Sequence, residues 1–405
     1  MALVAFLFYT AVFAYRKPFT VATFEGVSVG GFSYQILLVI SQGIGYMLSK
    51  FFGIRLIAEL KRIGRWKTSL VLIGGSWLSL LFFAIVPAPY GMIFIMVNGF
   101  LLGFMWGIVF SYVEGRRATD FIGAALAVSF IFAGGFTRSV AVWIRDNWHA
   151  PESWLGFLTG FVFLVPLLFF LYLMEKIPVP DANDIADRTI RQPMTKESRT
   201  TLLKQFGFGL LMLVVTYVFL TIMRDIRDNF MSNMWNELGY GKKPAIFTST
   251  ETITSIVVLV CISLLVVIRN NFKALQWAHG LIIAGFIIAG IASLLFKLNL
   301  ISGALWMQLV GLGLYMGYVP FNCILFERFI AAFRIAGNVG FLIYIADAWG
   351  YLGSMSVMIS KELFHIQLNW VSFYSNAVIV SAIVGAAATL VSLFYFRRKI
   401  TADPA

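Results

Sequence analysis

Charged residues are scarce in this sequence. Only 12% of its 405 residues are charged, whereas 60% are hydrophobic, and the mean hydropathy is +0.86. A water-soluble domain of this length needs a larger polar surface, so the composition excludes a soluble globular protein. It indicates a protein that crosses the membrane several times.

Histidine and cysteine are also rare, which limits the possible chemistry. The three histidines, His149, His279 and His365, lie far apart in the chain. The two cysteines, Cys261 and Cys323, lie in apolar runs and lack the spacing of a metal site or a disulfide framework. No nucleophile with a nearby base occurs within an apolar run. We therefore expect neither an enzyme nor a bound metal or cofactor.

Long apolar runs are abundant. A helix needs about 20 apolar residues to cross a bilayer, and about twelve such runs occur, at roughly 2–24, 32–54, 68–87, 91–113, 121–143, 154–175, 205–232, 246–268, 273–296, 301–326, 336–360 and 371–396. The one long polar connection divides the chain into an N-terminal half, 1–175, a cytoplasmic linker, 176–204, and a C-terminal half, 205–405. The sequence thus predicts an all-α membrane protein with six helices in each half.

Basic residues gather in the loops that follow the even-numbered spans. Such loops face the cytoplasm by the positive-inside rule, so we expect both termini on the cytoplasmic side. This orientation accounts for the net charge of +12 without a nucleic-acid partner. We expect no cleavable signal peptide, because the first apolar run is too long and contains a basic pair.

Two arginines inside the spans are the leading candidates for a binding site. A charge near the bilayer centre costs about 2.5 to 3.5 kcal/mol, so such residues are expected to be paired or functional. Arg16 has no acidic residue within one helical turn, whereas Arg224 has Asp228 four residues later, at a spacing that allows a pair along the same helix face. Tyr9 and Tyr217 precede the two arginines by seven residues each, so each half opens with a helix that presents a tyrosine and an arginine on one stripe.

An anion bound by both arginines explains this matched spacing. If the halves are related by an axis along the membrane normal, Arg16 and Arg224 would face each other across a central cavity. Arginine binds phosphate or carboxylate through two parallel hydrogen bonds. The alternative is that one arginine extends to the interface and Asp228 neutralises the other. Lys50 lies four residues after Tyr46, so the two can offer an ammonium and a hydroxyl to the same ligand.

Other polar residues of the spans are candidates for coupling or gating. Lys17 is expected to pair with Glu251 of the eighth span, either as a switch or as a fixed salt bridge. Asp347 of the eleventh span is a candidate for proton binding. Arg138 is expected near the outer membrane interface, with a role as a third ligand as the alternative. Pro18 removes a backbone donor and is expected to bend the first helix.

These residues resemble the major facilitator superfamily and, within it, the organophosphate:phosphate antiporters. The similar segments are "YRKPF" in the first span, "YMLSKF" in the second, "VFLTIMRDI" in the seventh and Glu251 in the eighth. Tyr318 in "GYVPFN" and Tyr351 in "WGYLGS" match two further tyrosines of that family. The family's acidic residue five positions after the seventh-span arginine is Asn229 here, with Asp228 one place earlier.

The resemblance implies the major facilitator fold, in which two six-helix halves are related by pseudo-two-fold symmetry and alternate the access to a central site. It implies a monomer in the bacterial inner membrane that carries a small organic anion, with phosphate or a phosphorylated metabolite favoured. Arg16 and Arg224 would bind the phosphate. The full set of expected substrate-binding residues is Arg16, Arg224, Lys50, Tyr9, Tyr46, Tyr217, Tyr318 and Tyr351, and the expected coupling or gating residues are Lys17, Glu251, Asp228 and Asp347.

Two other functions stay open at this point. One is a proton-coupled carrier or exporter of a carboxylate or amphiphilic substrate. The other, from a different class, is a transporter-like membrane sensor or scaffold.

Overall fold

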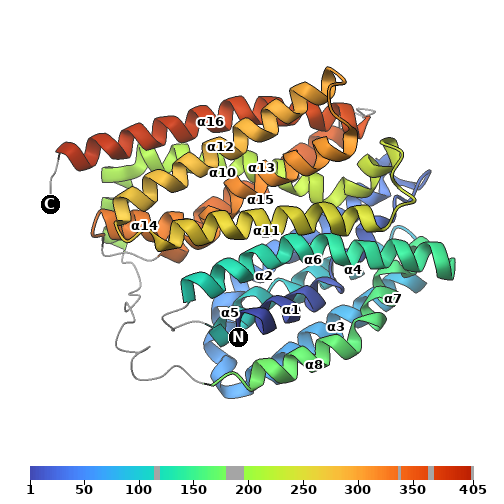
Figure 1. The fold of residues 1–405 in the computed structure, drawn as a ribbon. Coiled ribbons are helices and arrows are strands. Elements are labelled where there is room, and N and C mark those ends of the chain that lie inside the picture. The colour runs from blue at the N-terminus through green and yellow to red at the C-terminus, as the bar shows by residue number, and fades with distance from the viewer. Residues whose placement is uncertain (114–118, 179–195, 336–338, 364–368, 403–405) are drawn as a thin grey trace. The chain divides into compact units, whose positions relative to one another are not determined.

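A computed structural model describes residues 1–113, 119–178, 196–335, 339–363 and 369–402, with a few side chains, chiefly those of residues 53–63, outside the description. Up to residue 175 the elements are α1 (Ala2–Phe13), the 3-10 helix η1 (Pro18–Val21), strands β1 (Ser28–Val29) and β2 (Phe32–Ser33), α2 (Tyr34–Ile63), α3 (Arg65–Ile85), α4 (Gly91–Leu102), α5 (Met105–Val113), α6 (Thr119–Trp148), the 3-10 helix η2 (Glu152–Trp154), α7 (Leu155–Val162) and α8 (Leu164–Glu175) (Figure 1). The later elements are α10 (Lys196–Glu237), α11 (Ala245–Val267), α12 (Asn271–Lys297), α13 (Gly303–Cys323), α14 (Leu325–Ala332), α15 (Val339–Leu363) and α16 (Trp370–Ala402).

The helices fit a protein that crosses the membrane many times. Within the described part of the chain, nine helices are long and apolar enough to span a bilayer. The number is ten when α7 and α8, which are bent by 44° at their junction, form one span. All ten coincide with apolar runs predicted from the sequence. The two other expected spans fall on α1, an apolar helix of 12 residues, and on α2, which has 30 residues. The chain is therefore an all-α, multi-pass membrane protein, as its composition predicts.

The first expected span, 2–24, is a broken helix rather than a bent one. α1 ends at Phe13, and a new 3-10 helix begins at Pro18. Proline has no backbone N–H and its ring clashes with the carbonyl four residues earlier, so it is tolerated only at the first positions of a helix. The chain then turns through the hairpin of β1 and β2, where Gly30 and Gly31 both have positive φ, of 60° and 84°. Such a two-residue turn favours glycine.

The chain forms two compact units. The first comprises Met1–Ala186, Asp228–Thr252 and Val357–Gln367, and the second comprises Asp187–Arg227, Ile253–Ser356 and Leu368–Ala405. Helices α10, α11 and α15 thus contribute residues to both units. The predicted division at the linker 176–204 stays a prediction, and residues 179–195 of that linker lie outside the described part.

Within the first unit, α1 packs against α6 and α8, while α4 packs against both α2 and α3 (Figure 1). The contact between α2 and α4 is close because glycine lies on both helices. A side chain at Gly99 of α4 would collide with the backbone carbonyl of Gln42, and one at Gly45 of α2 with that of Met96. Small residues allow helix backbones to approach in this way in membranes, where van der Waals packing drives association.

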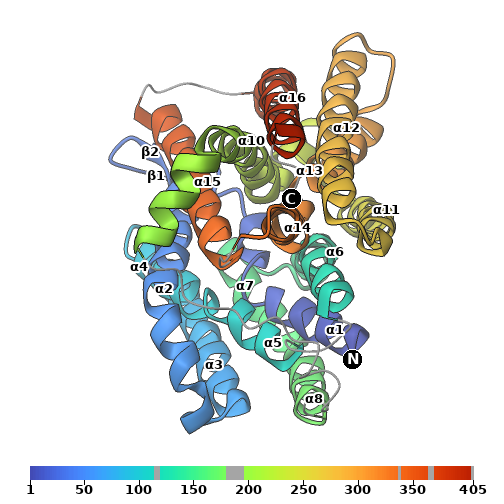
Figure 2. The ribbon, with the colours of Figure 1, turned by 90° about the vertical axis from the view of Figure 1, so that its left-hand side faces the viewer.

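The second unit is built around α12. This helix packs against α13, α14 and α16 (Figure 2). At the crossing of α12 and α13, Gly285 and Gly313 lie against each other's backbone. Both units therefore use glycine to bring a pair of helices into close contact.

Candidate functional site

The break in the first span places two cations in a turn. The backbone N–H groups of Arg16 and Lys17 both donate to the carbonyl of Phe13, at 2.9 and 3.0 Å, and the α-helix does not continue past this point. Arg16 and Lys17 consequently lie between α1 and η1. The stripe that the sequence predicts for Tyr9 and Arg16 requires one continuous helix, so this part of the prediction is wrong.

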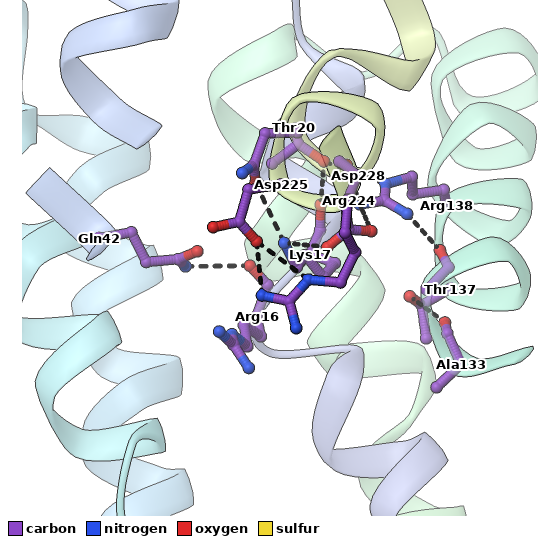
Figure 3. Close-up of polar contacts among 12 residues, drawn as sticks. Arg16, Lys17, Thr20, Gln42, Ala133, Thr137, Arg138, Arg224, Asp225 and Asp228 are labelled. Carbon is purple, nitrogen blue, oxygen red and sulfur yellow. Dashed lines mark hydrogen bonds and ion pairs between the residues drawn. The ribbon is translucent and has the colours of Figure 1, made fainter. Parts of the chain in front are cut away.

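Arg16 lies on an aromatic ring. Its guanidinium carbon is 4.3 Å from the ring centroid of Tyr46 on α2 and 5.7 Å from that of Phe13. The side-chain amide of Gln42, one turn before Tyr46, donates to the backbone carbonyl of Arg16 at 3.0 Å (Figure 3). A cation over an aromatic face is stabilised by the ring quadrupole, and the ring fixes the plane of the guanidinium.

The other expected ligands of this half have different surroundings. Tyr9 is 5% exposed and packs edge-on against the rings of Phe13 and Trp106, with centroids 5.3 and 5.4 Å away. Tyr9 thus belongs to the aromatic core of the first unit. Lys50 lies in α2, but its side chain is outside the described part of the structure.

Asp228 joins two cations in the first unit. Its carboxylate oxygens lie 2.5 Å from Lys17 Nζ and 2.7 Å from a terminal guanidinium nitrogen of Arg138 (Figure 3). Lys17 also donates to the side-chain oxygen of Asn229 at 3.0 Å, and Arg138 Nε donates to the hydroxyl of Thr20 at 3.1 Å. This cluster ties the turn after α1, α6 and α10 together. Its two cations and one carboxylate give these three side chains a net charge of +1.

The cluster changes three expectations from the sequence. Asp228 contacts Lys17 and Arg138, whereas i,i+4 spacing allows a pair with Arg224. Arg138, which the sequence places near the outer interface, is 1% exposed and forms an ion pair with Asp228. The ion pair of Lys17 is with Asp228, where the sequence predicts Glu251. These partners come from distant segments, and their packing is invisible in local spacing.

Glu251 is buried elsewhere in the first unit. It is 1% exposed on α11, and its side chain lies against Gly135 of α6, where a larger residue would collide with the Glu251 side chain and with the backbone of α11. A carboxylate held in the protein interior is costly unless its surroundings compensate, so Glu251 stays a candidate for coupling or gating.

In the second unit, Arg224 also lies on a tyrosine. Its guanidinium carbon is 4.1 Å from the ring centroid of Tyr318 on α13. Asp225 accepts from Arg224 Nε and from a terminal nitrogen at 3.1 and 2.6 Å, so the two neighbours form a two-bond ion pair (Figure 3). Their side chains are only 13% and 14% exposed. The acidic partner of Arg224 is therefore the next residue rather than Asp228.

A tyrosine pair connects this arginine to α15. The rings of Tyr217 and Tyr318 are stacked, with centroids 5.2 Å apart and an interplanar angle of 27°. The hydroxyl of Tyr217 donates to the carboxylate of Asp347 at 2.5 Å and lies 3.0 Å from the hydroxyl of Tyr318. Tyr351 follows Asp347 by one helical turn on α15. The structure thus brings together Tyr217 and Tyr318, which the sequence predicts as substrate-binding residues, and Asp347, which it predicts for coupling or gating.

Sequence reasoning missed the buried amides of the first unit. Gln42 and Asn98 interrupt apolar runs, yet they carry no charge and match no motif, so the only available signal was their polarity within a span. Arg227 is recognised from the sequence as an ionisable residue inside a span, but it is assigned no role. It is 1% exposed and donates to the carbonyl of Met307 at 3.3 Å in space left open by Gly311. Within the described residues, no group of three or more histidine, cysteine, aspartate or glutamate side chains could hold a metal ion.

Comparison with sequence families gives one match. The sequence model of a family of unknown function, DUF5690, matches residues 18–399. No curated protein sequence has significant similarity to the chain.

Two solved structures of transporters are similar in fold. The nucleoside transporter NupG has a TM-score of 0.62 at 13% identity, and the alignment covers 98% of each chain. A bacterial homologue of the human lysosomal transporter Spinster, inward-facing and unoccupied, has a TM-score of 0.60 at 13% identity, with 98% of this chain and 95% of that chain covered. The chain therefore has the same fold as these two transporters. Identity this low carries the fold alone.

We predict that Asp228→Asn strongly destabilises the protein. The substitution leaves Lys17 and Arg138 without their shared carboxylate, and removing one partner of a buried ion pair costs about 3 to 5 kcal/mol. Thermal unfolding of the purified protein measures the effect. The control is Asp146→Asn, because Asp146 pairs with Arg145 through side chains that are 36% and 25% exposed, and such pairs contribute about 0 to 1 kcal/mol. Equal losses in the two variants would contradict a structural role for the cluster.

Proposed function

The chain belongs to the DUF5690 family, whose function is unknown, and we propose that it is a secondary active transporter of a small organic anion that works by alternating access. The favoured substrates are phosphate and phosphorylated metabolites. We place the protein in the bacterial inner membrane as a monomer with both termini in the cytoplasm, following the positive-inside rule and the resemblance to organophosphate:phosphate antiporters.

The observation that carries the proposal is that each unit holds an arginine against a tyrosine ring, Arg16 in the turn between α1 and η1 and Arg224 within α10. The distances are 4.3 Å for Arg16 and Tyr46 and 4.1 Å for Arg224 and Tyr318. A stacked guanidinium is held in a fixed plane, so its hydrogen-bond donors are oriented before a ligand arrives, which lowers the entropic cost of binding. An ionisable residue within a membrane span is a candidate for a functional site, because its charge is costly there.

The charges of the first unit support an anion rather than a neutral substrate. Lys17 and Arg138 share one carboxylate, and Arg16 directly precedes Lys17 in the same turn. Lys17, Arg138, Asp228 and Arg16 together carry a net charge of +2. We propose that the positive potential of this region attracts the anion and that Arg16 and Arg224 bind it, with Tyr9, Tyr46, Tyr217, Tyr318, Tyr351 and Lys50 as further contacts.

We assign the remaining candidates to coupling and gating. The ion pair of Lys17 and Asp228 joins the turn after α1 to α10, and its release would free α10 from the first span. Glu251 is proposed as a second residue of this gate. The substrate exchanges for another anion, because an empty, positively charged site resists closure more than an occupied one.

One observation favours proton coupling as a second candidate. Tyr217 donates to Asp347 at 2.5 Å, and a carboxylate held by a hydroxyl within a membrane span is a chemically suitable proton-binding group. Among the titratable side chains near Asp347, Tyr217 donates to its carboxylate, and Tyr351 follows it by one turn of α15. Tyr318 lies against Tyr217, and Arg224 lies on the ring of Tyr318.

We predict that Arg16→Ala and Arg224→Ala each weaken the binding of inorganic phosphate by about 10- to 100-fold, the effect of losing a charge-assisted hydrogen bond. Titration calorimetry on the purified protein measures the binding. Arg65→Ala is the matched control, because Arg65 also lies on a tyrosine, 4.2 Å from the ring centroid of Tyr112, outside the proposed site. Unchanged phosphate affinity in both arginine variants would refute the proposed anion site.

We predict that phosphate exchange in proteoliposomes proceeds without a pH gradient and that Asp347→Asn retains it. Exchange needs only a second anion, whereas proton coupling needs a carboxylate that binds and releases a proton. The comparison is between radiolabelled phosphate exchange with equal internal and external pH and uptake driven by an imposed gradient. Uptake that requires the pH gradient, and that Asp347→Asn abolishes, would establish proton coupling instead.

A further inference from the structure

We propose that Gln42 and Asn98 are positioning residues for Arg16: they hold the backbone of the turn between α1 and η1, so that the guanidinium keeps its place on Tyr46. The inference rests on the anion-binding role proposed for Arg16 and adds two residues that no family motif marks.

The break leaves carbonyl groups that a continuous helix would satisfy. In an α-helix the carbonyl of Arg16 accepts from the N–H of Thr20. Here the N–H of Thr20 donates instead to the carbonyl of Lys17, at 3.0 Å. A backbone carbonyl buried in a membrane protein needs another donor, because no water is available in the bilayer core.

Two side-chain amides supply these donors. Gln42 Nε2 donates to the carbonyl of Arg16 at 3.0 Å, and Asn98 Nδ2 donates to the carbonyl of Tyr15 at the same distance. Gln42 also donates to Asn98 Oδ1 at 2.9 Å, and Asn98 donates to the hydroxyl of Ser76 at 2.7 Å. Gln42 is 6% exposed and Asn98 is fully buried. The turn is therefore fixed by a network from α2, α4 and α3.

The helix packing brings the two amides together. Gly99, next to Asn98, lies against the backbone of Gln42, so any larger residue there would push α2 away from α4. The small residue thus sets the distance at which the amides of Gln42 and Asn98 meet.

α2 holds Arg16 at two points. Gln42 and Tyr46 are four residues apart and lie on the same face of α2. Gln42 contacts the Arg16 backbone, and Tyr46 contacts the Arg16 guanidinium. Loss of the backbone contact frees the turn to move relative to α2, and the stacked geometry of the guanidinium is lost with it. A residue that merely fills space would not have this effect on one particular side chain.

The test measures the reactivity of Arg16 directly. Phenylglyoxal modifies arginine, and mass spectrometry of the digested protein gives a separate rate for Arg16 and Arg224 in each sample. The variants are Gln42→Met, which is close in shape and lacks the donor, and Asn98→Ala. The control is Gln35→Met, because Gln35 is a second buried glutamine of α2, 5% exposed, and it donates to the carbonyl of Ala22 at 3.2 Å and to Asn233 instead of the Arg16 turn.

We expect Gln42→Met and Asn98→Ala to raise the modification rate of Arg16 by about fivefold, the effect of one lost hydrogen bond. The rate at Arg224 should stay constant in the same samples, and Gln35→Met should leave Arg16 unchanged. An unchanged rate at Arg16 would overturn the proposal. An equal rise at Arg224, or an equal rise at Arg16 in the control variant, would overturn it too, because either result would mean that the substitutions loosen the protein as a whole.

Phosphate titration separates this inference from the proposed function. Gln42→Met should weaken inorganic phosphate binding about fivefold in the unmodified protein and should weaken it no further in an Arg16→Ala background. Equal losses in both backgrounds would mean that Gln42 does not act through Arg16. If the unmodified protein binds no phosphate, the proposed substrate is wrong, and the modification rates still decide whether Gln42 and Asn98 position Arg16.

Discussion

The arrangement of the first unit depends on Pro18 and the helix break that it imposes. Because proline cannot continue α1, the helix ends at Phe13, and Arg16 and Lys17 lie in a turn instead of on a helix face. The turn requires new partners for its carbonyls and for its charges. The amides of Gln42 and Asn98 satisfy the carbonyls, while Tyr46 and Asp228 receive the two cations.

The two cations of the turn have different environments, and this difference separates their proposed roles. Lys17 is ion-paired and 5% exposed, which suits a contact that holds helices together. Arg16 lies on an aromatic face, which fixes its plane while keeping its donors oriented. In the second unit Arg224 combines both features, since it lies on Tyr318 and is paired with Asp225. An anion bound there has to compete with Asp225, so the two arginines are not equivalent ligands.

The spans could be predicted because the length of an apolar run is a direct property of the sequence. Arg16 and Tyr46, and likewise Arg224 and Tyr318, were expected in one functional set, and the structure places each arginine on its tyrosine. The partners of Asp228 could not be predicted in the same way. Local spacing suggested Arg224, but Lys17 and Arg138 lie 211 and 90 residues from Asp228 in the chain and meet it only through packing within the first unit.

The helix break was underestimated for a related reason. Proline in a membrane helix is often tolerated as a bend when neighbouring groups satisfy the freed carbonyl. Here the neighbours are two amides on other helices, which stabilise a full break, and no motif in the sequence indicates that they converge. Residues that act through uncharged hydrogen bonds are the part of a site least visible in a single sequence.

The central claim is that the transported substrate is an anion. Thermal unfolding of the purified protein in the presence of inorganic phosphate, phosphate esters, carboxylates and neutral nucleosides tests it most directly, because a ligand that binds the folded state raises the unfolding temperature. We predict stabilisation by at least one phosphate-bearing compound and none by the nucleosides. Stabilisation by a neutral nucleoside, with no response to any anion, would contradict it.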